Sequence, residues 1–169
     1  MSDKRIFFAL WPDDPQREQL RNTIRPIVQA IEGTAVHRGN WHVTLAFVGE
    51  YPERLISELQ TAAAAIPFEP FRSSFDKAEY WAQAKVAVLT PTSISPELER
   101  LVGALNKLMT DAGLVVPTRV YRPHITIAKR VRRFETRRLA QAARVEWSGV
   151  ELVESVSAPG GSSYNPLKQ

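Results

Sequence analysis

Two short stretches decide the fold: Trp41–Glu50, which reads WHVTLAFVGE, and Tyr121–Arg130, which reads YRPHITIAKR. Each is rich in β-branched and aromatic residues and alternates in the manner typical of a strand. Two of the three histidines in the chain open the same pattern, His-apolar-Thr-apolar. Because side chains alternate across a strand, each histidine shares a face with the threonine two positions on. The sequence therefore predicts two strands that each present an imidazole and a hydroxyl on one side.

The same alternation predicts what else lies on each face. In the first strand, Ala46 and Val48 follow His42 and Thr44. The opposite, core-facing set is predicted to be Val43, Leu45 and Phe47. In the second strand, Ala128 and, if no bulge intervenes, Arg130 follow His124 and Thr126, while Ile125 and Ile127 face the core.

The remaining elements are predicted from periodicity, caps and breakers. Asp14 is expected to cap a first helix that Pro26 kinks or splits. Ser95 caps the clearest helix, with Pro96 at its first position. Helices are expected over 14–31, 53–66, 95–113 and 135–144, and further strands over 5–11, 68–75, 85–90 and 150–157, with a short last strand in the tail.

A repeat organises these elements. Leu10-Trp11-Pro12 leads through a helix to the first motif, and Leu89-Thr90-Pro91 leads through a helix to the second. No stretch between them is rich enough in Gly, Ser or Pro to be a linker. We expect two similar lobes packed side by side as one domain over residues 1–169.

Composition narrows the class of protein. The 169 residues are 44% hydrophobic and 24% charged, which is typical of a soluble globule. The absence of cysteine excludes disulfides, thiolate metal sites and cysteine nucleophiles. No stretch is long and apolar enough to span a membrane or to form a signal segment. We expect a cytoplasmic protein, monomeric by default and without an obligate protein partner.

The net charge of +4 is unevenly distributed and favours an anionic partner. Eight basic residues crowd into a short stretch: Arg119, Arg122, Lys129, Arg130, Arg132, Arg133, Arg137 and Arg138. Such a cluster can follow an RNA backbone, and a plain solvated surface is the alternative.

Two imidazoles and two hydroxyls across a groove suit displacement at phosphorus. One histidine can take a proton from water while the other gives one to the leaving oxygen, because an unperturbed imidazole titrates near neutral pH. Threonine hydroxyls and basic residues would hold the non-bridging oxygens. The sequence lacks a G-x-S-x-G serine context and phosphate-binding glycine loops. His37 completes no metal-ligand spacing with the other histidines, so we expect no metal and no cofactor. A single motif would have suggested only a hydrogen-bonded structural pair.

The paired motifs resemble those of the 2H phosphoesterase superfamily, and most of all its RNA 2′,3′-cyclic phosphodiesterases, formerly called bacterial 2′-5′ RNA ligases. The resemblance implies a bilobal α+β fold in which two mostly antiparallel sheets flank a central cleft. It also implies opening of RNA 2′,3′-cyclic phosphate ends to 2′-phosphates, with His124 activating water and His42 protonating the 3′ oxygen. Thr44 and Thr126 would hold the phosphate.

One departure concerns the basic residue after the second motif. Many members of the family have Arg five residues after the second histidine, where this chain has Lys129. Lysine keeps the charge but loses the bidentate fork, so the contact to phosphate would fall to Lys129 or to Arg130.

The sequence constrains less closely which residues bind the nucleotide base and which exact substrate is used. Candidates for stacking a base are Phe8, Trp41, Tyr121 and the pair Tyr80-Trp81, with a place in the core as the alternative for each. Trp41 and Tyr121 are favoured because they flank the motif strands. A small cyclic nucleotide or ADP-ribose cyclic phosphate is the alternative substrate, and a non-catalytic RNA-binding module is the alternative function. The physiological RNA and the importance of 2′-5′ ligation stay open.

Overall fold

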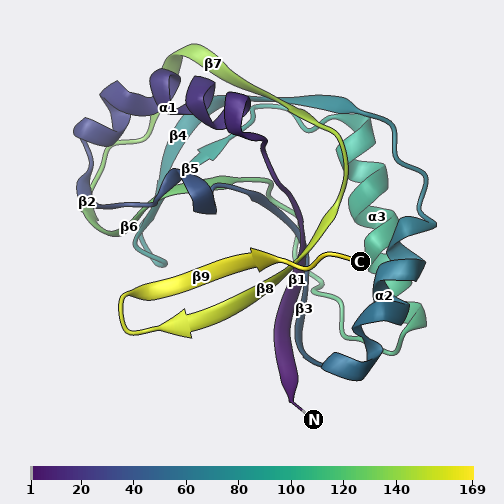
Figure 1. Ribbon diagram of the computed structural model, residues 1–169. Helices are drawn as coiled ribbons and strands as arrows, with labels where there is room; N and C mark the ends of the chain where they lie inside the picture. Colours follow the sequence, from purple (N-terminus) through teal and green to yellow (C-terminus); the bar gives the residue numbers. More distant parts are fainter. Residues whose placement is uncertain (1) are drawn as a thin grey trace.

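A computed structural model describes residues 2–169 as two antiparallel sheets flanked by helices (Figure 1). The strands are β1 (Asp3–Leu10), β2 (Glu32–Ala35), β3 (Val43–Pro52), β4 (Phe71–Trp81), β5 (Val86–Thr90), β6 (Ile125–Arg133), β7 (Arg137–Trp147), β8 (Glu151–Ala158) and β9 (Gly161–Pro166). The α-helices are α1 (Asp14–Gln29), α2 (Ile56–Ala64) and α3 (Pro96–Asp111), with short 3-10 turns at Arg38–Asn40 and Glu53–Leu55.

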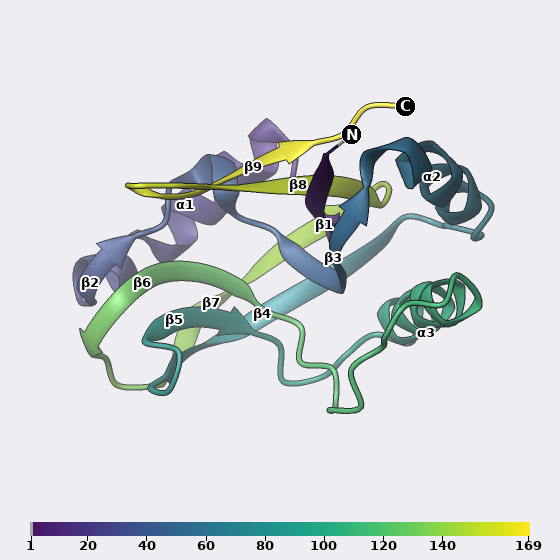
Figure 2. The same ribbon diagram turned by 90° about the horizontal axis from the view of Figure 1, so that it is seen from below.

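The two predicted motif strands lie in different sheets. One sheet has the order β3-β1-β8-β9 and the other β2-β6-β5-β4-β7. Figure 2 shows them as separate layers, with α2 and α3 together at one end. In each half, the strand that precedes the helix is the antiparallel neighbour of the motif strand: β1 of β3, and β5 of β6. The α+β class, the two antiparallel sheets and the duplicated unit are therefore confirmed.

A β-bulge follows the threonine in both motif strands. Phe8 pairs with Ala46 but Ala9 pairs with Thr44, so Leu45 is an extra residue in β3. Likewise Ala87 pairs with Ala128 but Val88 pairs with Thr126, so Ile127 is an extra residue in β6. A bulge re-aims the side chains that come after it. Strand alternation therefore fails beyond these points, and Phe47, predicted to be core, is 48% exposed.

The predicted start of α3 agrees with the structure, whereas α1 differs from its prediction in two details. The Ser95 hydroxyl accepts a hydrogen bond from the Leu98 N–H at 3.2 Å and caps α3 as predicted. The cap of α1 is Asp13 instead of Asp14, and its carboxylate accepts from the Gln16 N–H at 2.9 Å. Pro26 does not split α1, which continues to Gln29.

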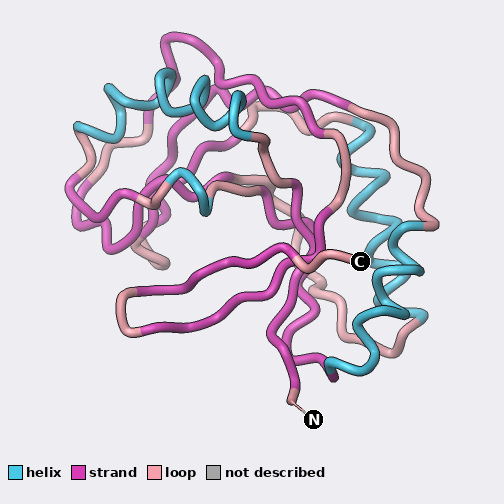
Figure 3. The backbone as a smooth tube through the Cα atoms, viewed as in Figure 1, coloured by secondary structure: helices cyan, strands magenta, loops and turns pink. Residues whose placement is uncertain are grey.

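The helix predicted over 135–144 is wrong, because this segment belongs to β7 (Figure 3). Its alanines, arginines and glutamine favour a helix locally. However, Ala143, Val145 and Trp147 alternate with exposed residues, and β7 pairs with β4 along most of its length. Burial of this alternating face outweighs the local helix preference.

Two clusters of buried hydrophobic side chains, one large and one small, form the core. Buried side chains of both sheets and of α1, α2 and α3 form one continuous cluster that includes Ile6, Phe8 and Leu10 of β1. A second, small cluster of Phe7, Ala9 and Val153 lies on the opposite face of β1 and β8. Trp11 and Tyr164 pack against this second cluster, and its Phe7 ring contacts His42 of the first motif.

In residues 2–169, none of the helices is long and apolar enough to cross a membrane.

Candidate active site

His42 is held in a fixed orientation by its own strand. Its Nδ1 lies 2.7 Å from the carbonyl oxygen of Asn40, and its Nε2 lies 3.1 Å from the Thr44 Oγ1. Because a carbonyl can only accept, Nδ1 must carry the proton of the neutral ring. Nε2 is then the basic nitrogen and accepts from the Thr44 hydroxyl. The structure thus brings the imidazole and hydroxyl of the first motif into direct contact.

Three aromatic rings enclose His42. Trp11 stacks on it with ring centroids 5.2 Å apart and an interplanar angle of 13°. Phe7 lies 5.2 Å away, and Tyr164 presents an edge-on contact at 5.0 Å. Burial in this apolar surrounding lowers the pKa of His42 to about 4, because the charged imidazolium loses its hydration. The Asn40 carbonyl opposes this, while His124 and Lys129 lower the pKa further.

His124 has the same backbone anchor but a more open surrounding. Its Nδ1 lies 2.8 Å from the carbonyl oxygen of Arg122, so Nε2 is again the basic nitrogen of the neutral ring. The Trp81 ring is 4.5 Å away. Burial lowers the pKa of His124, the Arg122 carbonyl opposes this, and the charges of Arg122 and Arg119 lower the pKa further.

The two half-sites are linked electrostatically and by one hydrogen bond. The charge of His124 contributes to the lowered pKa of His42, so the rings lie within electrostatic reach of each other. Tyr121, three residues before the second histidine, donates its hydroxyl to the Thr44 carbonyl at 2.8 Å. Burial raises the pKa of the Tyr121 hydroxyl, which therefore stays a donor. This hydrogen bond joins the segment that carries His124 to the strand that carries Thr44.

The bulge in β6 separates the two candidate basic residues. Lys129 turns toward the first half-site: its Nζ is 5.9 Å from the centroid of the Tyr164 ring, and its charge acts on His42. Arg130 adopts a left-handed backbone with φ of 50° and donates from Nε to the Thr34 Oγ1 at 3.3 Å, on the edge strand β2. The bulge therefore removes the condition, uninterrupted alternation, under which Arg130 was expected to share the face of His124 and Thr126.

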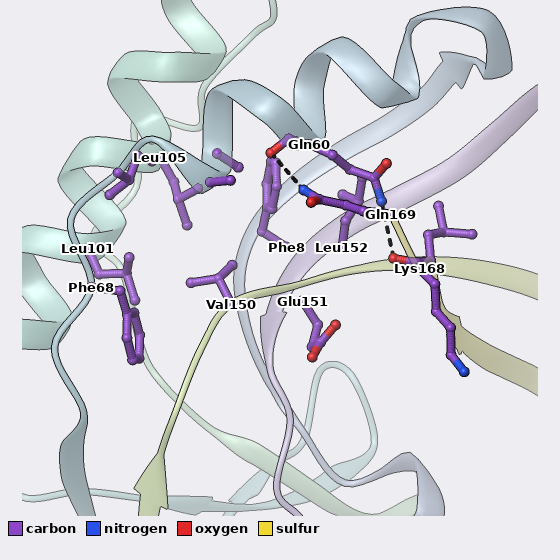
Figure 4. Close-up of a pocket in the computed structure, with 14 residues that line it drawn as sticks. Phe8, Gln60, Phe68, Leu101, Leu105, Val150, Glu151, Leu152, Lys168 and Gln169 are labelled. Atoms are coloured by element: carbon purple, nitrogen blue, oxygen red, sulfur yellow. Dashed lines mark hydrogen bonds between the residues drawn. The ribbon is translucent and has the colours of Figure 1, made fainter.

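Two of the predicted stacking residues, Phe8 and Trp41, are also corrected. Phe8 is 1% exposed and Trp41 is 5% exposed, so neither offers a face to a base. Phe8 instead lines a groove of about 450 Å³ between α2, α3 and the end of the chain (Figure 4). Tyr121 is half-buried, with its hydroxyl engaged by the Thr44 carbonyl.

Three aromatic residues that border His42 were not among the predicted site residues: Phe7, Trp11 and Tyr164. Phe47 packs in turn on Phe7. Beside the second motif, Trp81, one of the predicted stacking candidates, lies against His124. Trp11 had a signal, since it directly follows β1 and precedes a proline. Tyr164 is brought in by the pairing of β9 with β8, and Phe47 by a bulge, and neither feature has a local signature in the sequence.

The basic cluster divides among several surfaces. Arg119 and Arg122 act on His124, and Lys129 acts on His42. Arg137 lies over the Phe134 ring, and Arg138 pairs with Asp76 at 3.7 Å. Within residues 2–169, no group of three His, Cys, Asp or Glu side chains is arranged to hold a metal ion.

Comparisons with known proteins agree with this arrangement. The chain matches the family described as LigT like Phosphoesterase over residues 10–89. It is 25% identical to the RNA 2′,3′-cyclic phosphodiesterase of Archaeoglobus fulgidus, over 97% of this chain and 98% of that protein. It is 27% identical to the Escherichia coli K12 protein of the same name, over 98% of this chain and 95% of that protein. The crystal structure of E. coli LigT complexed with 3′-AMP has a TM-score of 0.86 at 26% identity, covering 98% and 96% of the two chains.

The fold, the paired motifs and these matches define a phosphoesterase of the 2H superfamily. Within that superfamily, the chain is similar to the LigT-like phosphoesterases. The resemblance drawn from the two motifs is confirmed.

Proposed function

We propose that this phosphoesterase hydrolyses 2′,3′-cyclic phosphate ends of RNA to 2′-phosphomonoesters by two-histidine acid/base catalysis without a metal. The observation that carries the proposal is the pair of half-sites, each with Nδ1 anchored to a backbone carbonyl and Nε2 left as the reactive nitrogen. The names of the A. fulgidus and E. coli relatives support the choice of substrate.

The reaction needs one proton acceptor and one proton donor on opposite sides of the phosphorus. Nε2 of His124 takes a proton from water as the water oxygen bonds to phosphorus. The bond between phosphorus and the 3′ oxygen breaks, and Nε2–H of His42 protonates that oxygen. The Thr44 and Thr126 hydroxyls and Lys129 hold the non-bridging oxygens, where negative charge accumulates. The product carries a 2′-phosphate and a free 3′ hydroxyl.

The lowered pKa of His42 sets a condition on its role as the general acid. In the free protein His42 titrates at about 4 and lies beside Lys129, so His42 is neutral at physiological pH. His42 acts as the acid when it is protonated while His124 is neutral, and a bound phosphodiester anion favours this state by raising the pKa of His42. A substrate with sulfur in place of the 3′ oxygen tests this, because a thiolate leaves without a proton. Such a substrate should restore turnover to His42→Ala and not to His124→Ala; the reverse pattern would exchange the two roles.

The activity itself is tested with an RNA oligonucleotide whose terminal 2′,3′-cyclic phosphate is radiolabelled, in the presence of EDTA. We expect a 2′-phosphate product, at least 100-fold slower turnover by His42→Ala or His124→Ala, consistent with roughly that contribution from general acid–base catalysis, and full turnover by the matched variant His37→Ala. Full activity of either site variant would refute the two-histidine mechanism.

The same preparation decides between the alternatives. A non-catalytic RNA-binding module would bind RNA in a salt-sensitive way and turn nothing over. Greater turnover of cyclic mononucleotides or ADP-ribose cyclic phosphate than of the oligonucleotide would select the small-nucleotide alternative. Incubation with 5′-hydroxyl RNA at high concentration tests 2′-5′ joining. We place the enzyme with RNA in the cytoplasm as a monomer, which fractionation and light scattering test.

A further inference from the structure

The His124 half-site carries a wall of stacked side chains that the proposed hydrolysis does not use. The Arg122 guanidinium lies over the Trp81 ring, 4.4 Å from its centroid, and the Trp81 ring is in turn 4.5 Å from the ring of His124. We call Trp81 and Arg122 the Trp81–Arg122 wall. It extends outward from the reactive imidazole to solvent, where the Arg122 side chain is 61% exposed.

Glu79 contacts both side chains of the Trp81–Arg122 wall. Its Oε2 accepts from the Trp81 Nε1–H at 3.3 Å and lies 3.5 Å from a terminal nitrogen of Arg122. Its Oε1 lies 3.8 Å from Lys77. A guanidinium has N–H donors in a rigid fork, and stacking on an indole orients that fork in advance. Arg122 therefore reaches solvent already oriented, with donors beyond the one directed at Glu79.

The two half-sites differ in what they offer a second anion. Around His42 the neighbours are the rings of Phe7, Trp11 and Tyr164. The cation that acts on His42 is Lys129, which the proposed mechanism assigns to the scissile phosphate. Around His124 the neighbours include the guanidinium groups of Arg122 and Arg119, which act electrostatically on the imidazole. An anion beyond the scissile phosphate is favoured on the His124 side.

We propose that the Trp81–Arg122 wall is a second phosphate subsite: Arg122 binds the internucleotide phosphate that precedes the terminal cyclic phosphate, and the RNA strand leaves the cleft on the His124 side. This inference rests on the proposed function and adds to it the way an RNA end is distinguished from a mononucleotide. Arg119 adds to the attraction from the same loop. Glu79 positions Arg122, and the phosphate takes the donors that point away from this carboxylate.

The test compares three substrates that share one reactive end: adenosine 2′,3′-cyclic phosphate, the dinucleotide ApA ending in a 2′,3′-cyclic phosphate, and the same dinucleotide with a neutral methylphosphonate linkage. We expect wild-type kcat/KM for the charged dinucleotide to exceed that for the neutral one about tenfold, which corresponds to about 1.4 kcal/mol. Arg122→Gln should reduce this ratio to about 1, and Arg122→Lys should keep part of it. Arg100→Gln, the same change on the exposed side of α3, should leave the ratio as in wild type.

Salt dependence gives a second measurement. Each phosphate contact to a single strand contributes about −0.7 to the slope of log affinity against log salt concentration, so Arg122→Gln should make the slope for the charged dinucleotide less negative by roughly that amount. A charged-to-neutral ratio near 1 in wild type, or an unchanged ratio in Arg122→Gln, would overturn the subsite. Failure of wild type to open any of the three cyclic phosphates would instead overturn the proposed function.

Discussion

Protonation of His42 should make the stability of this protein fall steeply in mild acid. The neutral ring packs among Trp11, Phe7 and Tyr164, whereas an imidazolium there would be poorly hydrated and close to Lys129. Its pKa is about 4 in the folded protein and about 6.5 in an unfolded chain. Between these values the unfolded state binds more protons, so the free energy of unfolding falls as the pH drops below about 6.5.

The size of this loss of stability follows from the linkage between proton binding and unfolding. A single histidine with these two pKa values removes about 2 kcal/mol of stability between pH 7 and pH 5, and about 3 kcal/mol by pH 4. His124, whose pKa is also lowered, adds a loss of the same sign. Carboxylates titrate in the same range, so the contribution of His42 is isolated by comparing wild type with His42→Gln, which cannot be protonated.

The assay is urea unfolding at intervals from pH 7.5 to pH 4.5 for wild type, His42→Gln and the exposed-site control His37→Gln. The glutamine can offset the curve by a constant amount, and only the change of the difference with pH is read. We expect the advantage of wild type over His42→Gln to shrink by about 2 kcal/mol from pH 7 to pH 5. A change below about 0.5 kcal/mol would show that the His42 cavity admits the charged ring, and the electrostatic picture of the first half-site would be refuted.

Three further perturbations test the geometry. Tyr121→Phe removes the hydroxyl that bridges the two motif segments and should lower the free energy of unfolding by about 1–3 kcal/mol in urea titrations, because a buried carbonyl loses its donor; no loss would contradict the bridge. Lys129→Gln should weaken competitive inhibition by inorganic phosphate several-fold while Arg130→Gln changes it little, since the bulge turns only the first toward the cleft; equal effects would contradict that orientation. Phe8→Ala should cost about 3–5 kcal/mol of stability and Phe47→Ala less than about 1, because the first ring is core and the second is half exposed; thermal unfolding with similar losses would contradict this division.

Local patterns sufficed where they agreed with tertiary packing. The alternating stretches around His42 and His124 are strands, and Ser95 with Pro96 marks the start of α3. In these segments the propensity, the caps and the apolar periodicity all favour the same structure, so one sequence was enough to predict them.

Prediction failed where a long-range pairing decided the outcome. The segment before Trp147 forms β7 because its alternate side chains are buried against β4 and α1, which no local signal announces. The bulges at Leu45 and Ile127 have the same origin: each is defined only by the register of the partner strand. In β3 the extra residue places Phe47 at the surface, although alternation predicts a place in the core. In β6 the extra residue turns Lys129, and not Arg130, toward the first half-site.

The two bulges also explain how a duplicated frame yields two unlike half-sites. Phe47 and Lys129 each stand five residues after a motif histidine, and each follows the bulge to the cleft side of its strand. At equivalent places, therefore, the first strand contributes a ring that packs on Phe7, and the second contributes a cation that acts on His42 across the cleft. A reaction that needs a proton acceptor and a proton donor at one phosphorus requires one histidine to be neutral while the other is protonated. The repeat supplies the common orientation of the two imidazoles, and Lys129, at the position equivalent to Phe47, adds to the burial that lowers the pKa of His42.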